Sequence, residues 1–296
     1  MIFIDGIGIG KEDYEFNPFF KYGFKTFTEI FGTVPTLSNQ FLNRNNTYLF
    51  PTDALLGIPG LPQSGTGQTS IFCGMNAPEY VGKHFGPYPY STLIPVIKEQ
   101  NIFLHYKNIG KPVFFANAYP KVFFDYVDSG KSRLSVTTLS CKLSGMRLNR
   151  VSDVRKGRAL TAEITNERWN RRLGYNLAVI KPRTAARRLL RIASQHTFTL
   201  YEYFLTDHFG HRRHVDEMVP AMKALDEFLF TIITELNTKK ISLVICSDHG
   251  NFEDLSVKTH TLNPAVTITA GKFSREMAQE IKDLTEIKHA ITRYIK

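Results

Sequence analysis

Short apolar runs that stop at a polar residue are the clearest pattern along this chain. Each has the length of a buried β-strand and is closed by a charged or turn-forming residue. Two such runs are Val113–Ala116 and Ala265–Thr269. Three others stop at an aspartate, and we expect all five to be strands; these three are Ile2–Ile4 before Asp5, Phe198–Leu205 before Asp207, and Ile241–Cys246 before Asp248.

A helical pattern separates the last two of these runs. Apolar residues recur at spacings of three and four from Val215 to Leu236, although Pro220 falls inside the pattern. Strand, helix and strand in this order predict a βαβ unit and therefore a parallel sheet. A second helix is expected over Ser274–Ile295. Because ligands bind beyond the carboxyl ends of parallel strands, the three aspartates are expected to converge on one site.

The middle of the chain has a different composition. Residues 76–195 are rich in Tyr, Arg, Lys and Pro, and their strand and helix patterns are weak. We interpret them as a cap or substrate domain inserted into the first domain. The catalytic core would then be discontinuous and comprise residues 1–75 and 196–296.

Charge narrows the choice of partners. The 296 residues are 43% hydrophobic, which argues against global disorder, and the net charge is +10 from 37 Lys+Arg against 27 Asp+Glu. A basic balance favours anionic partners, namely nucleic acid, acidic lipids or phosphorylated metabolites. Much of the arginine excess lies in the tract from Arg147 to Arg191, where a merely solvated positive surface is the alternative. No apolar run of about 18 residues occurs, so we expect no membrane partner.

The cysteines indicate a reducing environment. Cys73, Cys141 and Cys246 are widely spaced and odd in number, so they form neither a disulfide framework nor a cysteine-based zinc site. The first residues do not have the composition of a secretory leader. We therefore expect free thiols in a cytoplasmic protein.

A loop rich in glycine and hydroxyl groups is the first candidate for chemistry. Residues 61–70 read Leu-Pro-Gln-Ser-Gly-Thr-Gly-Gln-Thr-Ser. Glycines let a backbone approach a ligand closely, and a following helix N-terminus favours an anion. The loop is not a Walker motif, because no lysine follows the second glycine. In isolation, an ordinary Ser/Gly loop is an equal alternative.

Carboxylates and imidazoles supply the second candidate. Each has an ordinary explanation when taken alone, such as a turn, a solvated histidine-rich loop or a structural histidine. Together their oxygen and nitrogen atoms suit Zn²⁺, Mn²⁺ or similar divalent ions, and six such groups suffice for two ions. Two ions can clamp the attacking and leaving oxygens of a phosphoryl transfer. The six residues are Asp5, Asp207, His211, Asp248, His249 and His260.

The order of these motifs resembles the alkaline phosphatase superfamily. The closest similarity is to its cofactor-independent phosphoglycerate mutase and phosphopentomutase branch. The resemblance implies an α/β fold, in which an alkaline-phosphatase-like core with a mostly parallel sheet flanked by helices carries a smaller inserted α+β cap. The motifs are Asp-Gly at 5–6, Ser-x-x-Gly at 64–67, Asp-x-x-x-His at 207–211, Asp-His-Gly-Asn at 248–251 and Thr-His-Thr-x-Asn-Pro at 259–264.

The same resemblance implies roles for these residues. One ion would be held by Asp207, His211 and His260, and the other by Asp5, Ser64, Asp248 and His249. Ser64 would be the nucleophile, with Thr66 as the alternative because the family accepts either residue type. The implied cofactors are two divalent ions, Mn²⁺ or Zn²⁺, with Mg²⁺ possible.

Two departures from the branch shape the functional hypothesis. Gln68 stands where the mutases have histidine, and the chain is far shorter than a typical mutase. We therefore expect an enzyme, a phosphohydrolase or phosphotransferase that acts on a small phosphorylated substrate through a phosphoserine at Ser64. A true phosphomutase, a nucleic-acid-binding protein and an inactive metal-binding relative are the alternatives. No basic-aromatic module favours nucleic acid as a partner, and monomer and dimer stay equally open. Substrate-binding candidates in the cap are Arg158, Arg168, Arg171 and Arg172.

Overall fold

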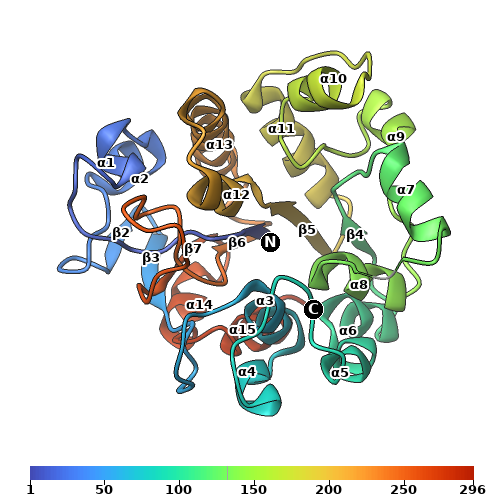
Figure 1. The fold of residues 1–296 in the computed structure, drawn as a ribbon, viewed down its shortest axis with the longest axis horizontal. Helices are drawn as coiled ribbons and strands as arrows, with labels where there is room; N and C mark the ends of the chain where they lie inside the picture. Colours follow the sequence, from blue (N-terminus) through green and yellow to red (C-terminus); the bar gives the residue numbers. More distant parts are fainter. Residues whose placement is uncertain (132) are drawn as a thin grey trace.

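A seven-stranded sheet forms the centre of the protein (Figure 1). The computed structural model describes residues 1–131 and 133–296. The order across the sheet is β2-β3-β7-β6-β1-β5-β4. The strands are β1 (Ile2–Ile4), β2 (Leu42–Arg44), β3 (Thr47–Thr52), β4 (Val113–Phe115), β5 (Phe198–Tyr203), β6 (Ser242–Cys246) and β7 (Ala265–Gly271).

Most of the strands run in one direction. β6, β1, β5 and β4 are parallel to one another, whereas β7 is antiparallel to both β6 and β3. β3 therefore points the same way as the four parallel strands, and only β7 and β2 point the other way. The predicted mostly parallel α/β sheet is confirmed.

Side chains of each strand alternate between two buried faces. On β1, Ile2 and Ile4 join one apolar cluster and Phe3 joins the other, as a pleated strand requires. The first face is covered by α1 (Pro18–Lys21), α2 (Lys25–Phe31), α11 (Pro182–Ala193), α12 (Leu205–Arg212) and α13 (Val215–Glu235). The second is covered by α3 (Ser64–Cys73), α4 (Ala77–Val81), α5 (Leu93–Gln100), α6 (Ile102–Asn108), α8 (Val136–Leu143), α14 (Ser274–Glu280) and α15 (Glu286–Tyr294).

The predicted βαβ unit is present, with one strand inserted. α13 spans Val215–Glu235 and contains Pro220 in its interior. It connects β5 to β6, and β1 lies between these two strands, parallel to both. The carboxyl ends of β1, β5 and β6 therefore lie next to one another at one edge of the sheet.

The expected single C-terminal helix is wrong. Helix α14 ends at Glu280 and α15 begins at Glu286. Between them the backbone bonds to another segment: Asp53 N donates to Lys282 O, and Leu284 N donates to Asp53 O. These bonds interrupt the helical hydrogen-bond pattern, while the apolar side chains of Ile281 and Leu284 stay fully buried.

The hairpin of β2 and β3 was not predicted from the sequence. Its turn is formed by Asn45 and Asn46, both at positive φ (49° and 59°), a conformation that asparagine tolerates. β3 then pairs with β7 along its full length, although Pro51 lies within it. This partner comes from the far end of the chain, so no local pattern reveals it.

Residues 76–195 contribute both to the core and to a lobe at its rim. Strand β4 forms an edge of the central sheet, and α5, α6 and α8 pack on its second face. A separate apolar cluster around Trp169 lies farther out, in the lobe formed by α7 (Lys121–Asp128), α9 (Val151–Arg155) and α10 (Glu167–Leu173). A cap with boundaries at 76 and 195 stays a prediction.

Much of the arginine-rich tract is paired with acids on α13. Arg183 contacts Glu227, and Arg187 forms a two-pronged contact with Glu235. Exposed pairs of this kind add little stability, but they match the packing of α11 against α13. All three cysteines are free and buried. Within the described ranges, no helix combines the length and apolar character needed to cross a bilayer.

A large-to-small change under α13 tests this core. Phe228 is fully buried, and its ring packs on the ring of Tyr201 in β5, with the ring centroids 5.3 Å apart. Phe228→Ala should lower the free energy of unfolding by about 3–5 kcal/mol, because it removes apolar burial and leaves a cavity. The matched change Phe41→Ala, at a side chain 67% exposed, should cost about 0.5 kcal/mol or less. Urea unfolding measures both, and equal costs would contradict this packing.

Candidate metal centre and nucleophile

The predicted ligands all lie at the carboxyl edge of the sheet. Asp5 follows β1 directly, and Asp248 follows β6 by two residues. The predicted strand run Phe198–Leu205 is shorter than expected, because β5 ends at Tyr203 and Leu205 begins α12. Asp207 consequently lies in the first turn of a helix, one turn before His211, and their side chains share one face.

Asp207, His211 and His260 form the first group, which we call the Asp207 cluster. The Nε2 atoms of His211 and His260 each lie 3.3 Å from Asp207 Oδ1 and 3.1 Å from each other. One candidate ligand atom from each residue lies within 4.8 Å of the others. The loop before β7, which is distant in sequence from α12, thus brings His260 next to Asp207 and His211 on that helix.

Backbone carbonyls orient both histidines of this cluster. His211 Nδ1 lies 2.7 Å from the carbonyl oxygen of Lys258, and His260 Nδ1 lies 2.6 Å from that of Pro62. A carbonyl only accepts, so Nδ1 carries the hydrogen and donates it. Each Nε2 then points toward Asp207, in the orientation typical of metal-binding histidines.

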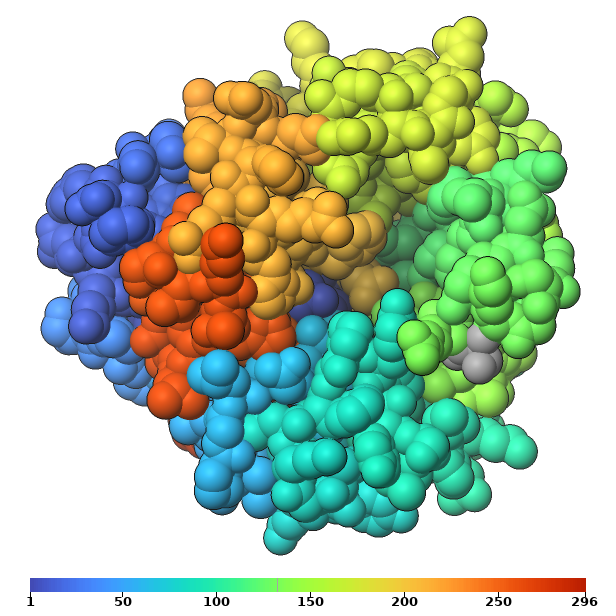
Figure 2. Space-filling view, in the orientation of Figure 1, coloured from blue at the N-terminus to red at the C-terminus, as the bar shows by residue number. Residues whose placement is uncertain are grey.

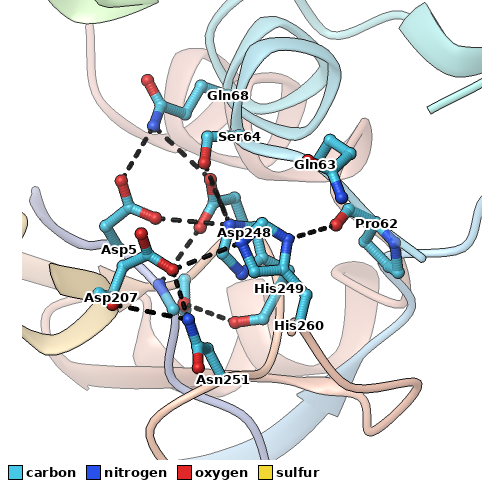
Figure 3. A network of polar contacts seen from close by, with 12 residues as sticks. Asp5, Pro62, Gln63, Ser64, Gln68, Asp207, Asp248, His249, Asn251 and His260 are labelled. Atoms are coloured by element: carbon cyan, nitrogen blue, oxygen red, sulfur yellow. Dashed lines mark hydrogen bonds and ion pairs between the residues drawn. The ribbon is translucent and has the colours of Figure 1, made fainter. Parts of the chain in front are cut away.

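Asp5, Asp248 and His249 form the second group, the Asp5 cluster. His249 Nε2 lies 3.3 Å from Asp5 Oδ1 and 3.6 Å from Asp248 Oδ2. The His249 ring stacks on that of His260, with centroids 3.7 Å apart. The two clusters are therefore adjacent, as Figure 3 shows.

Ser64 faces the Asp5 cluster from the second face of the sheet. It is the first residue of α3, it is 5% exposed, and its Oγ lies 3.1 Å from His249 Nε2. The N-terminus of this ten-residue helix favours negative charge beside the hydroxyl. The hydroxyl, the two carboxylates and the imidazole thus meet in one buried space.

Thr66, the alternative nucleophile, is turned away. Its Oγ1 donates to the carbonyl of Gln63 and accepts from the amide of Phe85, both at 3.2 Å. The Thr66 side chain is fully buried, and its hydroxyl is engaged in these two hydrogen bonds. The geometry favours Ser64.

Gln68 bridges the two carboxylates of the Asp5 cluster. It lies one helical turn after Ser64, and its Nε2 lies 3.3 Å from Asp5 Oδ2 and 3.4 Å from Asp248 Oδ2. The amide donates where the mutase branch has an imidazole. It therefore contributes a neutral donor between two acids without adding charge.

The buried charges of the site fit a cation. Burial and the nearby Asp248 and Asp207 raise the pKa of Asp5 well above its usual range, and burial also raises that of Asp248. Asp5 Oδ1 is buried and accepts no hydrogen bond from the described residues. Clustered carboxylates with an unsatisfied oxygen are stabilised by a positive ion, and the oxygen and nitrogen donor set suits a divalent metal.

In the Asp207 cluster the pKa of the carboxyl group is lowered, whereas the pKa values of Asp5 and Asp248 are raised. Burial alone would raise the pKa of Asp207, but hydrogen bonds with His211 and His260 lower it. The hydrogen bond with Asp207 in turn raises the pKa of His211 to about 9. The acid is thus held ionised, the form in which it can bind a metal.

Asn251, the last residue of the Asp-His-Gly-Asn motif, positions Asp207. Its Nδ2 donates to Asp207 Oδ1 at 2.6 Å. Gly6, at φ +70°, passes so close that an added Cβ would lie 2.9 Å from the Asp207 Cβ. The motif was recognised in the sequence, but this role of its asparagine was not.

Glu253 ties together three loops around the site and was missed in the sequence. It is 1% exposed, and it accepts from the backbone amides of Gly8 and Asn251, both at 2.8 Å. Its other oxygen accepts from Thr261 Oγ1 at 2.5 Å and Asn263 Nδ2 at 3.0 Å. One carboxylate thereby fixes the segments that follow Asp5, His249 and His260.

The four arginines proposed for substrate binding are all paired with acids. Arg158 pairs with Asp153, outside the site. Arg168, Arg171 and Arg172 surround Glu217, in the first turn of α13. Arg168 and Arg172 also line a cavity beside α12, whereas Arg171 does not. Their contact with substrate stays a prediction.

Glu253→Gln tests whether this carboxylate holds the site in shape. The change keeps the volume but turns an NH₂ toward two of the four donors. Each buried donor left without an acceptor costs about 1–3 kcal/mol. The metal-free variant should therefore unfold at a lower urea concentration and bind Mn²⁺ more weakly in calorimetry.

Asp254→Asn is the matched control for that experiment. Asp254 is adjacent and only partly buried, and it accepts from nearby Ser256. It should leave Mn²⁺ affinity unchanged. Equal Mn²⁺ affinity in Glu253→Gln and the wild type would contradict the positioning role.

Comparisons with known proteins agree with this geometry. Residues 178–296 match the model of the family described as the Metalloenzyme superfamily, a stretch that holds five of the six candidate ligands. A search of curated proteins gave no match. The cold-active alkaline phosphatase of a psychrophilic Shewanella species is 10% identical, with a TM-score of 0.51, over 100% of this chain and 99% of that one.

Two other similar structures are much longer. The chain spans 45% of the PH0037 protein from Pyrococcus horikoshii (13% identity, TM-score 0.40, 64% of this chain). It spans 37% of phosphoglycerate mutase from Leishmania mexicana (12% identity, TM-score 0.39, 67% of this chain). The predicted mutase branch stays a prediction. The superfamily resemblance is confirmed: residues 178–296 carry the Metalloenzyme superfamily pattern, and the whole chain has an alkaline-phosphatase-like fold.

Proposed function

We propose that this protein is a metal-dependent phosphohydrolase or phosphotransferase that acts on a small phosphorylated molecule through a phosphoserine at Ser64. The observation that carries the proposal is the position of Ser64 Oγ, 3.1 Å from His249 Nε2 and at the N-terminus of α3. A hydroxyl held between a helix N-terminus and a cluster of metal-type ligands is placed to attack phosphorus.

Two divalent ions, Mn²⁺ or Zn²⁺ with Mg²⁺ as a third option, fit the two clusters. The Asp207 cluster would hold one, and the Asp5 cluster together with Ser64 would hold the other. When bound, such ions lower the pKa of a coordinated hydroxyl and neutralise charge on the phosphoryl oxygens.

The chain's own residues would do the rest. Ser64 Oγ, after losing its proton to solvent, would form a bond to phosphorus while the bond from phosphorus to the leaving oxygen breaks. The leaving oxygen would take up a proton from solvent and depart as an alcohol. The N-terminal amides of α3 favour the negative charge of the phosphoryl group. The amide of Gln68 donates to both Asp5 and Asp248 and so keeps the two carboxylates next to one another.

The acceptor of the second step decides between hydrolase and transferase. Attack by water on phosphoserine releases inorganic phosphate and restores the hydroxyl. Attack by an alcohol gives a new ester, and retention of the first product would give a mutase. Measuring released phosphate against transferred phosphate in the presence of glycerol distinguishes hydrolysis from transfer.

The first experiment on this proposal counts the ions. Crystals of Mn²⁺-loaded protein should give two anomalous peaks about 4 Å apart, the usual separation in two-metal sites. Asp207→Ala should lose the peak at the Asp207 cluster and keep the other. A loaded protein with no peak near Asp248 or His260 would contradict the proposal.

The second experiment removes the nucleophile. Ser64→Ala should lower phosphomonoester turnover by roughly three orders of magnitude or more, because the attacking oxygen is gone. The carboxylates and imidazoles remain, so metal content by elemental analysis should largely persist. Thr66→Ser keeps the hydroxyl that donates to Gln63 and should retain near-wild-type turnover. Near-wild-type turnover in Ser64→Ala would assign the attack to another group.

A further inference from the structure

A cavity of about 660 Å³ is lined in part by α12, the helix that carries Asp207 and His211. Leu205, His208 and Arg212 of α12 line it. These three positions lie on one face of the helix, because they are spaced three and four residues apart. Asp207 and His211 lie on another face of the same helix and belong to the Asp207 cluster. The cavity and the proposed reaction centre therefore share one helical wall. Figure 2 shows a hollow at the centre of the face that is drawn, and blue atoms from the start of the chain lie deep inside this hollow.

Aromatic side chains form much of the rest of the lining. Tyr119 and Phe123 stack with ring centroids 4.1 Å apart and planes 29° from parallel. Trp169 also lines the cavity, and Phe204, at the end of β5, is 46% exposed beside it. Flat apolar surfaces of this kind bind rings through burial and offset stacking.

Charged side chains of both signs also line the cavity. They include Arg168, Arg172, Arg212, Glu163, Glu202 and Glu217. Arg168 and Arg172 are paired with Glu217. Glu163 accepts from the backbone amides at the start of α10, and Glu202 accepts from Thr137 Oγ1 at 2.8 Å. An apolar ring does not compete for these contacts, because it binds to the aromatic side chains.

We propose that this cavity holds the organic part of the substrate, and that the substrate is a phosphomonoester of a ring-bearing alcohol. The proposal rests on the proposed function, because it places the phosphoryl group at Ser64 and the alcohol beside α12. It predicts poor use of small esters that have no ring.

A matched pair of substrates tests the preference for a ring. With metal-loaded full-length protein, kcat/KM for 2-phenylethyl phosphate should exceed that for ethyl phosphate by about tenfold or more, the gain from burying a ring. Both are esters of alkyl alcohols, so intrinsic reactivity is similar. Equal kcat/KM values for the two esters would overturn the proposal.

A variant pair ties the preference to the cavity. Phe204→Ala should reduce the ring preference several-fold, and its partly exposed position lets the fold persist. Phe41→Ala, the same change at the β2 edge of the sheet, should leave the preference intact. An unchanged preference in Phe204→Ala would overturn the proposal.

Binding of phosphonates separates this proposal from the proposed function. Calorimetry compares 2-phenylethylphosphonate with ethylphosphonate, neither of which can be hydrolysed. Turnover of the esters without a ring preference in binding would overturn the cavity assignment and leave the phosphatase intact. A ring preference that Phe204→Ala removes, in a protein that turns over none of the esters, would support the cavity and contradict the proposed function.

Discussion

Burial of like charge at one edge of the sheet is the constraint on which the rest of the structure depends. Asp5 and Asp248 are brought together because β1 and β6 are neighbouring parallel strands that end at the same edge. Two carboxylates out of water repel one another and cost folding energy unless a cation or hydrogen-bond donors compensate them. Gln68 and His249 supply part of this compensation. The unsatisfied oxygen of Asp5 marks a position where a bound cation would supply the remainder.

The surrounding loops are held by buried hydrogen bonds that follow from this constraint. Glu253 gathers four donors from three loops, and Asn251 fixes Asp207. Backbone carbonyls of Pro62 and Lys258 fix the histidine rings of the Asp207 cluster. A metal site needs ligands that are already oriented, because each freely rotating side chain would have to be ordered on binding. The candidate ligands are thus held in place by residues outside the two clusters.

Local patterns were sufficient for part of this architecture. Strands β1, β4, β6 and β7 and helix α13 were predictable because apolar spacing within each segment reports its burial. The six candidate ligands could be selected because their motifs are contiguous, and the structure brings them together in two clusters. Interactions between distant segments were not visible: the break between α14 and α15 depends on Asp53, and β3 depends on β7. For the same reason the arginines of α10 suggested substrate binding, whereas Glu217, far away in sequence, engages them.

A covalent phosphoryl group on Ser64 is the central claim, since it links the metal-type clusters, the helix N-terminus and the cavity in one reaction. The most direct measurement is an acid quench of Mn²⁺-loaded protein during turnover of a phosphomonoester, followed by peptide mass spectrometry. The account predicts a peptide that contains Ser64 and carries one added phosphoryl group, with fragment ions that locate the group on Ser64. Steady turnover with no phosphorylated peptide, or with the group on Thr66 or another residue, would contradict it.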